Sequence, residues 1–383
     1  MINLGILTAH HYPRLGGMEY VTHFMANELN KRADVNVSVA CNSLSGICEK
    51  FQYEYNCYRS KKLSYLTPWL FRYNQEKMIR EQSINLLHGP MLHGGGYDCY
   101  KQNLKYNIPF IGHSHGADVQ VVKEIGYGAL LDNASSQKVK KVIQHADHLI
   151  AISQINKENM LAVGAEENKI SVIHNGVEIE KINSMPFQSQ RQLWGVNEDD
   201  FLIITVGRNK PVKRMELLFK ALNKLKEYNK IKCICVGPTL DLKQSAAENG
   251  SLDQVIFTGQ IPDQVELGSN PPYPELINLY RSSNLYISTS YVESFGSAAA
   301  DALACGIPVI VGSKHGVQDI IECQQTGFIM EKETSEELAD LILECYKNRD
   351  QLKALSKMIK GSVAHVNWAN ITDQYERVFK SII

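Results

Sequence analysis

Short apolar runs alternate with longer helical patterns along almost the whole 383-residue chain. Such runs are typical of buried strands, and strands that alternate with helices predict parallel α/β units. We interpret these runs as strands: Asn3–Thr8, Val35–Ala40, Leu86–His88, Phe110–Gly112, His148–Ala151, Ile170–Ile173, Phe201–Gly207, Ile231–Gly237, Val255–Gly259, Leu285–Ser290 and Ile307–Val311. The alternation predicts doubly wound sheets, in which ligands bind beyond the carboxyl ends of the strands.

A polar stretch from Glu178 to about Asp200 divides the predicted strands into two groups. A chain of this length is too long for one ordinary core, so we expect two facing Rossmann-like domains with a deep cleft between them. We predict a first domain over residues 1–185, a second over 186–362 and a final segment over 363–383. Helices are expected at Met18–Lys31, Glu216–Tyr228, Pro274–Ser282, Ser294–Ala304 and Glu336–Asn348.

Composition excludes several classes of protein. The formal net charge of -1 gives no electrostatic support to general nucleic-acid binding. The chain contains no apolar run of about 18 residues, and its start lacks the pattern of a signal peptide. Its nine cysteines are scattered without zinc spacing. We therefore expect reduced thiols, no structural metal and a cytoplasmic location.

The segment Tyr291–Asp301 is the strongest candidate for chemistry. A carboxylate, Glu293, follows a strand, and Gly296 then opens an alanine-rich helix. A helix N-terminus attracts anions, and small residues let a ligand approach the backbone. Glu293 and Asp301 lie roughly 12 Å apart along a helix, which allows one to meet a sugar and the other a ribose. An ordinary cap followed by a packed helix accounts for the pattern equally well.

Two further loops resemble phosphate-binding elements. The basic loop Gly207–Lys213 presents Arg208 and Lys213, which suit phosphate oxygens, although solvated basic loops are common. Gly16 and Gly17 precede a predicted helix and could bring backbone amides to a phosphate or sugar, or form only a tight turn. A third glycine run, at 94–96, is interpreted as a flexible loop.

His115 follows a predicted strand in the segment His113–Asp118, where an imidazole could donate a hydrogen bond to a sugar. A structural histidine is the more common alternative, and a metal site is disfavoured because no third cluster supports it. The segment Phe51–Arg80 interleaves aromatic and basic residues. It suits a sugar platform or an anionic membrane surface, but a helical pair with core aromatics is slightly favoured.

Seven motifs in order resemble those of the retaining glycosyltransferases of family 4 (GT4), which have the GT-B fold. They are Pro13-x-x-Gly16-Gly17-x-Glu19, His115-Gly116-x-Asp118, Ala151–Gln154, Asn175–Val177, the loop Gly207-Arg208 to Lys213, Glu293-x-Phe295-Gly296, and the pair Gly306–Val311 and Thr326–Phe328. The resemblance extends from Leu4 nearly to the C-terminus. It also implies that the last helix crosses back onto the first domain.

The resemblance implies roles for single residues. Arg208 and Lys213 would hold the donor diphosphate, and Glu293 would contact the donor sugar. Asp301 would bind the ribose, and His115 would lie near the donor sugar. The remaining donor-binding residues implied are Gly16, Gly17, Ser294, Phe295, Gly296 and Ser297.

Three departures from the family pattern stand out. Asp301 takes the place of the usual glutamate, and the downstream element reads His315-Gly316-Val317-Gln318-Asp319, with a histidine for a glycine and another shortened acid. The segment Pro262–Pro274 is longer than usual and lies where the nucleotide base would be held. The identity of the base is therefore open.

These features predict a metal-independent, retaining glycosyltransferase. We expect a nucleotide-sugar donor, best matched by a UDP-sugar, and a saccharide or lipid-linked acceptor in cell-surface polysaccharide or glycolipid assembly. A small soluble acceptor, a nucleotide-sugar 2-epimerase and a non-catalytic nucleotide-sugar-binding protein remain as alternatives. Peripheral contact with the cytoplasmic membrane face and the oligomeric state stay open, and no cofactor besides the donor is expected.

Overall fold

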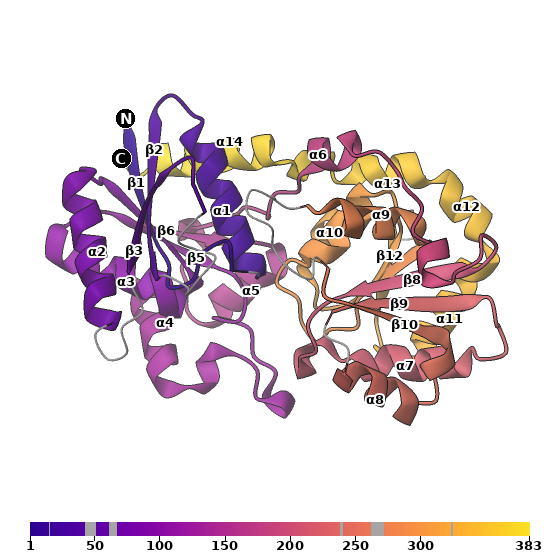
Figure 1. Ribbon diagram of the computed structural model, residues 1–383. Helices are drawn as coiled ribbons and strands as arrows, with labels where there is room; N and C mark the ends of the chain where they lie inside the picture. The colour runs from indigo at the N-terminus through magenta and orange to yellow at the C-terminus, as the bar shows by residue number, and fades with distance from the viewer. Residues whose placement is uncertain (15, 43–50, 61–66, 238–239, 262–271, 323–324) are drawn as a thin grey trace. The chain divides into compact units, whose positions relative to one another are not determined.

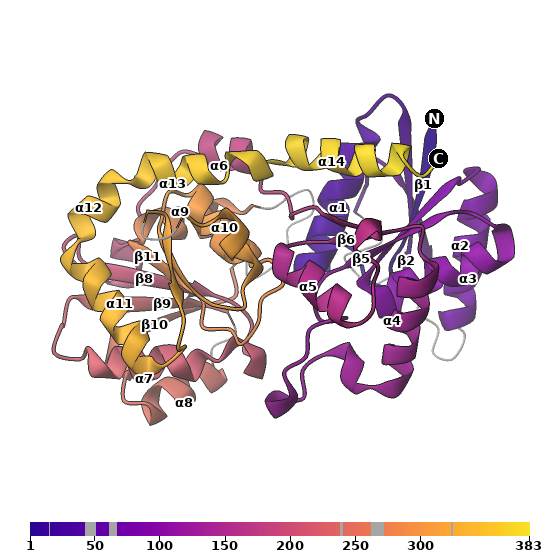
Figure 2. The same ribbon diagram turned by 180° about the vertical axis from the view of Figure 1, so that it is seen from behind.

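The computed structural model describes residues 1–14, 16–42, 51–60, 67–237, 240–261, 272–322 and 325–383. Internal contacts divide the chain into two compact units, drawn in Figures 1 and 2. Unit 1 comprises Met1–Gly176 and Trp368–Ile383, and unit 2 comprises Val177–Asn367. The domain limits predicted from the sequence, 185 and 362, remain a prediction beside these contact-based ones. Each unit is built on its own parallel sheet.

The sheet of unit 1 has the strand order β3-β2-β1-β4-β5-β6-β7, and every pairing is parallel. Its strands are β1 Ile2–Leu7, β2 Val35–Asn42, β3 Asn56–Ser60, β4 Leu86–Pro90, β5 Phe110–Ser114, β6 His148–Ala151 and β7 Ile170–Val172. Residues such as Leu4, Ile6 and Leu87 are fully buried within it. Because all seven strands run the same way, the loops that follow them lie along one edge.

Six helices belong to unit 1. They are α1 Gly17–Asn30, α2 Thr67–Glu81, α3 Tyr97–Tyr106, α4 Asn133–His145, α5 Gln154–Ala162 and the final helix α14 Trp368–Lys380. Short turns of helix occur at Met91–Gly96, Lys123–Ile125, Ala129–Leu131 and Glu167–Lys169. Although α14 comes last in the chain, it packs on α1, where Trp368 stacks on Phe24 with ring centroids 5.7 Å apart.

The sheet of unit 2 has the order β10-β9-β8-β11-β12-β13, again fully parallel. Its strands are β8 Phe201–Val206, β9 Ile231–Val236, β10 Val255–Gly259, β11 Leu285–Ile287, β12 Val309–Gly312 and β13 Gly327–Met330. Its helices are α6 Ile179–Ser184, α7 Met215–Lys224, α8 Leu240–Glu248, α9 Pro274–Ser282, α10 Ser297–Ala304, α11 Ser335–Lys347, α12 Arg349–Ala354 and α13 Ser356–Ser362. Shorter turns lie at Gln192–Trp194, Pro211–Lys213, Leu252–Gln254, Gly316–Ile320 and Ala364–Val366.

The predicted elements are found with small shifts at their ends, apart from three corrections. The segment Phe51–Arg80 is not a helical pair, because Asn56–Ser60 forms β3 and only Thr67–Glu81 is helical. The predicted helix Ser294–Ala304 begins at Ser297, since Gly296 has a left-handed backbone with φ of 92°. Two strands, β3 and β13, were not predicted, and both lie at sheet edges.

The glycine run at 94–96 is not a loose loop. It lies in the turn Met91–Gly96, which contacts α3, α4 and the strands β1, β4 and β5. A Cβ at position 95 would lie 2.0 Å from the carbonyl oxygen of Leu7, so the backbone there approaches the strand too closely for a side chain. Close packing therefore requires glycine at position 95.

Candidate active site

The carboxyl ends of β8 and β11 bring two motifs of unit 2 together. The strands are neighbours, with Leu285 opposite Ile203, so the basic loop after β8 lies beside the loop after β11. Three hydrogen bonds join these loops: Tyr291 N donates to Val212 O over 2.9 Å, and the Thr289 hydroxyl lies 3.0 Å from the carbonyl oxygens of both Lys213 and Arg214. The fold therefore fixes one loop against the other.

Lys213 and Glu293 form a direct ion pair and hydrogen bond between the two loops. The hydroxyl of Ser290 donates a second hydrogen bond, of 2.9 Å, to the same carboxylate. Burial alone would raise the pKa of Glu293, but the Lys213 ammonium, helped by His315 and by the hydrogen bonds, holds it below its ordinary value. Glu293 is therefore an anion at neutral pH, placed next to a cation.

The backbone of Glu293 is held as firmly as its side chain. Its N–H donates to Lys314 O over 3.1 Å, and its carbonyl oxygen accepts from Gly316 N over 2.8 Å. His315, which replaces a glycine of the family pattern, is only 1% exposed and donates from Nε2 to the carbonyl oxygen of Ser290 over 2.8 Å. This departure thus supplies an additional tie to the Glu293 loop.

Arg214 adds a second ion pair behind the first. Its guanidinium donates to Glu333 over 2.7 Å and to the Thr289 carbonyl over 3.1 Å, and it lies 4.5 Å from the centre of the Tyr291 ring. Arg214 and Glu333 both have left-handed backbones, with φ of 46° and 51°. Glu333 also accepts from the backbone N–H and hydroxyl of Ser313. Loops after four strands, β8, β11, β12 and β13, are therefore tied to one another.

The N-terminus of α10 follows Glu293. Gly296 is the residue before the first turn, and no side chain caps the helix. Phe295 is buried at 2% exposure, so its side chain anchors the turn, whereas Ser297 is the first residue of the helix proper. Amides at the start of a helix carry a partial positive charge, so this position suits a phosphate oxygen. Ser294 completes the link from Glu293 to this turn.

Asp301 lies in α10, one turn beyond its start. Burial, followed by the nearby carboxylate of Glu178, raises the pKa of Asp301 to about 7. Its carboxyl group is therefore partly protonated at neutral pH, unlike that of Glu293. A group of this kind can both donate and accept hydrogen bonds, as a pair of ribose hydroxyls requires.

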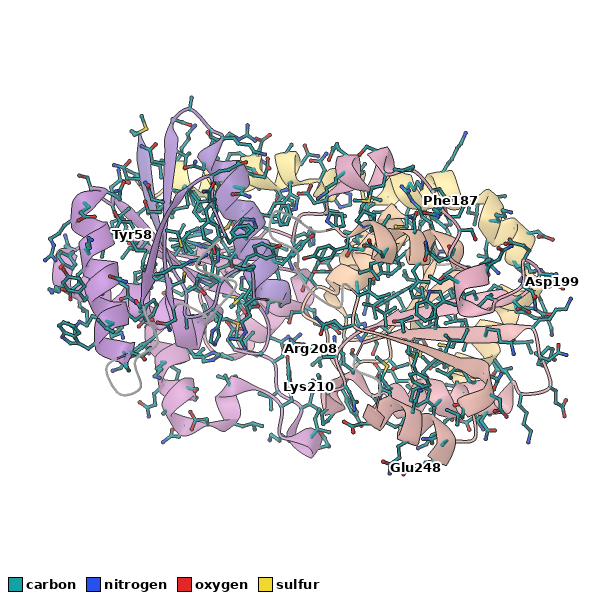
Figure 3. All side chains as sticks on the ribbon, in the orientation of Figure 1. Tyr58, Phe187, Asp199, Arg208, Lys210 and Glu248 are labelled. Carbon is teal, nitrogen blue, oxygen red and sulfur yellow. The ribbon has the colours of Figure 1, made fainter. Side chains whose placement is uncertain are left out.

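Arg208 lies in the loop after β8 and is exposed, as Figure 3 shows for Arg208 and Lys210. The start of this loop is held against the end of β9. Gly207 N donates to Val236 O over 3.0 Å, and a Cβ on Gly237 would lie 2.1 Å from Gly207 O. No ion pair joins Arg208 to a carboxylate in the part of the chain that is described. Its charge is open to an anionic ligand.

In unit 1, the glycine pair begins α1. Gly16 has an extended backbone, and a Cβ there would lie 2.1 Å from an Oε atom of Glu19. The Glu19 carboxylate, 3.6 Å from Arg14 Nε, thus folds back over position 16. Gly17 is exposed, with nothing within 4 Å of its Cβ position. A side chain at position 16 would displace the flexible end of Glu19, and position 17 leaves the helix start open to a ligand.

His115 follows β5 in a turn built by Asp118. The fully buried Asp118 carboxylate accepts from Ser114 Oγ, Gly116 N and Leu92 N over 2.8–2.9 Å. Gly116 has φ of 103°, a conformation that favours glycine. Glycine and aspartate in this motif thus shape the turn, and His115 is the residue that the turn presents.

The imidazole of His115 lies against that of His113, with centroids 4.2 Å apart and the rings tilted by 40°, and His113 Nδ1 lies 3.1 Å from Nε2 of His88. Burial lowers the pKa of His115 to about 4 and that of His88 to about 3, and it also lowers the pKa of His113. All three rings are neutral at pH 7. His115 can then donate one hydrogen bond without bringing a charge to the site.

Sequence reasoning missed Arg214, Ser290 and Glu333, and it noted His315 only as a departure. The chain gave a signal for Arg214, a second cation directly after Lys213, but none for Glu333, which lies 119 residues further on. Their contacts depend on strand neighbours that are distant in sequence. The predicted roles of Arg208, Lys213, Glu293, Asp301, His115 and the glycines remain predictions.

Other features of the described chain bear on ligands. Within it, no group of three or more His, Cys, Asp or Glu residues could hold a metal ion, and no helix is both long and apolar enough to cross a bilayer. On α2, Trp69 and Tyr73 form an exposed stack, but Arg72 and Lys77 pair with Glu76 and Glu81. Two of the three basic side chains of this helix are therefore paired, and Arg80 has no ion pair among the described residues. Tyr65, Lys61 and Lys62 of the same predicted segment lie outside the described residues.

Two family models match the chain. The model described as Glycosyltransferase Family 4 matches residues 15–181, and the one described as Glycosyl transferases group 1 matches residues 186–362. A D-inositol 3-phosphate glycosyltransferase of Mycolicibacterium smegmatis is 26% identical over 235 residues, covering 61% of this chain and 52% of that protein. Another, from Catenulispora acidiphila, is 26% identical over 63% of this chain and 59% of its own. The match spans about half the length of these relatives.

Solved structures resemble the whole chain. Anabaena HepE in complex with UDP superposes with a TM-score of 0.78 at 19% identity, covering 100% of both chains. Sucrose-phosphate synthase from Thermosynechococcus elongatus gives a TM-score of 0.82 at 18% identity, covering 100% of this chain and 99% of that one. At such low identity, these similarities establish the fold.

Proposed function

Because the chain belongs to the glycosyltransferases that combine a family 4 domain with a group 1 domain of GT-B type, we propose that it transfers a sugar, with retention of configuration, from a nucleoside diphosphate to an acceptor hydroxyl. The acceptor that we favour is a saccharide or a lipid-linked saccharide, as in the assembly of cell-surface polysaccharide or glycolipid. A small soluble acceptor is the second candidate. The D-inositol 3-phosphate glycosyltransferases among the relatives give a reason to test it.

One observation carries the proposal: the Lys213–Glu293 pair lies directly before the N-terminus of α10. A departing diphosphate needs positive charge, which Lys213, Arg208 and the amides of that helix would supply. Glu293 would keep Lys213 in place and accept a hydrogen bond from a sugar hydroxyl. Preorganised charge where negative charge develops is the largest contribution to catalysis in many transferases.

The proposed chemistry is a front-face displacement. The bond between the anomeric carbon and the diphosphate oxygen breaks, and the acceptor oxygen bonds to that carbon from the same face. The acceptor proton passes to the departing phosphate oxygen, so atoms and charge balance without a protein nucleophile. His115, neutral at pH 7, would donate to a hydroxyl of the donor sugar. The cationic groups take the role that a metal has in other transferases, so we propose that no metal is required.

The first experiment uses the intact protein with a panel of nucleotide sugars, UDP-glucose among them, with and without saccharide and cyclitol acceptors. We expect release of UDP that depends on acceptor, and proton NMR of the product should show the anomeric configuration of the donor. Release of free sugar and UDP without acceptor would identify an epimerase or hydrolase instead. Tight binding without any turnover would identify a binding protein.

Metal independence has its own measurement. Turnover in excess EDTA should equal turnover with added Mg²⁺ or Mn²⁺, because Arg208 and Lys213 supply the positive charge. A reversible loss of activity on chelation would show that a metal carries the diphosphate charge, and the role proposed for the basic loop would then be wrong.

A further inference from the structure

Arg59 is a cation near the carboxyl end of β3, in unit 1, for which the proposed chemistry has no role. Its side chain is partly buried, and its guanidinium carbon lies 4.6 Å from the centre of the Tyr53 ring. It also donates a hydrogen bond to the Tyr53 hydroxyl. Tyr53 in turn donates to the carbonyl oxygen of Tyr12, in the loop after β1. Arg59 is therefore held in one place, tied across the sheet to that loop.

The electrostatic surroundings of Arg59 are neutral. The groups that act on its charge are the Tyr53 hydroxyl and the thiols of Cys57 and Cys41. The pKa of the buried His11 is lowered by burial, then by His23 and then by Arg59. Among the described residues, no carboxylate lies within ion-pair distance of Arg59. Arg214, by contrast, is also partly buried but has Glu333 as its partner. Burial would lower the pKa of Arg59, but the Tyr53 hydroxyl and the Cys57 and Cys41 thiols raise it above its ordinary value, so the cation is retained and can attract an anion.

A second unsatisfied group lies beside it. His11 is 3% exposed, and its ring centre is 5.5 Å from that of Tyr53. Its Nε2 contacts the Tyr55 hydroxyl over 2.6 Å, but its buried Nδ1 has no hydrogen-bond partner in the described structure. Buried polar atoms are almost always paired, so an orphan beside an unpaired cation indicates a missing ligand or water.

The position of this cluster agrees with ligand binding. His11 follows β1, and Arg59 is the last residue but one of β3, so both lie at the carboxyl edge of the unit 1 sheet, the same edge that carries His115 after β5. In parallel sheets this is the edge at which ligands bind. The donor-phosphate groups proposed above belong to unit 2, which leaves these groups of unit 1 to another ligand.

We propose that Arg59, positioned by Tyr53, binds a phosphoryl group of the acceptor. This inference rests on the proposed function, because it assigns a class of acceptor to the same enzyme. Guanidinium binds phosphate through two parallel N–H···O bonds, which lysine cannot reproduce. The acceptor is then a phosphorylated molecule, either a soluble sugar or cyclitol phosphate or a lipid-linked saccharide phosphate.

The test keeps the donor site occupied. The full chain is saturated with UDP, inorganic phosphate is titrated, and phosphorus NMR line broadening reports binding. We expect saturable phosphate binding by the parent and a loss of about 10- to 100-fold in affinity for Arg59→Gln, with Arg59→Lys in between. Tyr53→Phe, which removes the hydroxyl but keeps the ring, should weaken binding less than Arg59→Gln. Arg72→Gln, an exposed arginine on α2, is the matched control and should bind like the parent.

Two outcomes would overturn the inference: no saturable phosphate binding by the UDP-saturated parent, or unchanged binding by Arg59→Gln. UDP affinity, measured by calorimetry, separates this from the proposed function. If the parent binds no nucleoside diphosphate, the proposed function is wrong, whether or not inorganic phosphate binds. Inositol phosphate in solution and prenyl diphosphate in neutral vesicles, each as competitor of inorganic phosphate, then distinguish the two sources of the phosphoryl group.

Discussion

The two units differ in the polar groups that they bury at the carboxyl ends of their strands. In unit 2, cations meet carboxylates, as in the pairs Lys213–Glu293 and Arg214–Glu333. In unit 1, the corresponding edge of the sheet holds neutral imidazoles, with His88, His113 and His115 in one group and His11 and His23 in another. Arg59 is a partly buried cation of that unit without a carboxylate partner among the described residues.

The difference follows from what each edge is proposed to bind. A diphosphate binds to positive charge, and an ion pair holds a cation such as Lys213 in a fixed position before the ligand binds. Sugar hydroxyls need neutral donors and acceptors, which buried imidazoles supply. The contrast therefore predicts that the two units respond differently to pH and to loss of a charge.

The largest effect should come from acid. The buried histidines of unit 1 have a pKa near 6.5 when unfolded, and lower values in the fold, about 3 for His88 and about 4 for His23 and His115. At a pH between the folded and unfolded pKa values, these histidines are protonated in the unfolded chain and neutral in the folded one. The free energy of unfolding therefore falls as pH drops below about 6.5. Each such histidine contributes up to about 1.4 kcal/mol per pH unit.

Hydrogen exchange followed by mass spectrometry between pH 7.5 and 4.5 should check this, after correction for the intrinsic exchange rate. Peptides from β4 and β5 should lose protection before those from β8 and β9. If peptides from both units lost protection at the same pH, the predicted difference between the units would be wrong. His145, exposed at the end of α4, offers His145→Gln as a control that should change the profile little.

The second effect concerns the Lys213–Glu293 pair. Glu293→Gln should lower turnover by about 100- to 1000-fold, because the charge that orients Lys213 and meets the sugar is removed. Nucleoside diphosphate affinity should change little, and no glycosyl adduct should accumulate. Steady-state kinetics and calorimetry measure the two quantities, with the exposed Glu248→Gln on α8 as the control (Figure 3). An adduct on Glu293 would contradict the front-face route.

The third effect concerns Asp301, whose substitution should increase stability but weaken ligand binding. Burial and Glu178 raise the pKa of Asp301 to about 7, so the fold loses stability as pH rises from about 3.8 towards 7. Asp301→Asn should raise the free energy of unfolding by about 1–3 kcal/mol at pH 8, and by less at pH 5. It should also weaken binding of the nucleoside diphosphate.

Urea denaturation at the two pH values and calorimetry check both parts of this prediction. Asp253→Asn, exposed on the same unit, should change neither quantity. A variant that is stabilised but binds normally would remove Asp301 from the ribose site, and one that is destabilised at pH 8 would contradict the effect of burial.

The smallest effect tests the left-handed backbone of Arg214. Arg214→Ala and Arg214→Gly both lose the contacts to Glu333 and Tyr291, but glycine adopts φ of 46° without strain. The alanine variant should be less stable by about 1 kcal/mol than the glycine variant. Both should raise KM for the donor, because Lys213 loses its neighbour. Equal stabilities would show that the backbone relaxes once the ion pair is gone.

The fold was largely predictable because the central strands contain short apolar runs, even where polar residues follow the run, as His88 does in β4. The edge strand β3 reads Asn-Cys-Tyr-Arg-Ser and is mostly partly exposed, so it carries no apolar run to recognise. β13, the other missed strand, is also an edge strand of only four residues. Edge strands are covered on one side only, so their side chains are under weaker constraint to be apolar.

The site was predictable where it lies in one continuous segment, as around Glu293 and α10. The contacts of Lys213 with Glu293, 80 residues apart, and of Arg214 with Glu333 depend on which strands become neighbours. The pKa of Asp301 depends on Glu178 in the same way. Such relations arise from packing and are not present in any local pattern.

The position of α14 has a consequence for synthesis. Trp368 stacks on Phe24 of α1 and takes the space beside Gly176, where a Cβ would lie 2.3 Å from its ring, and Tyr375 lies against the rings of His88 and His113. The ribosome makes these residues after all of unit 2. The first unit to emerge is thus completed only after the second, and its histidine groups stay uncovered while unit 2 is made. A chain that stops before Trp368 would hold all of the second unit and an unfinished first one.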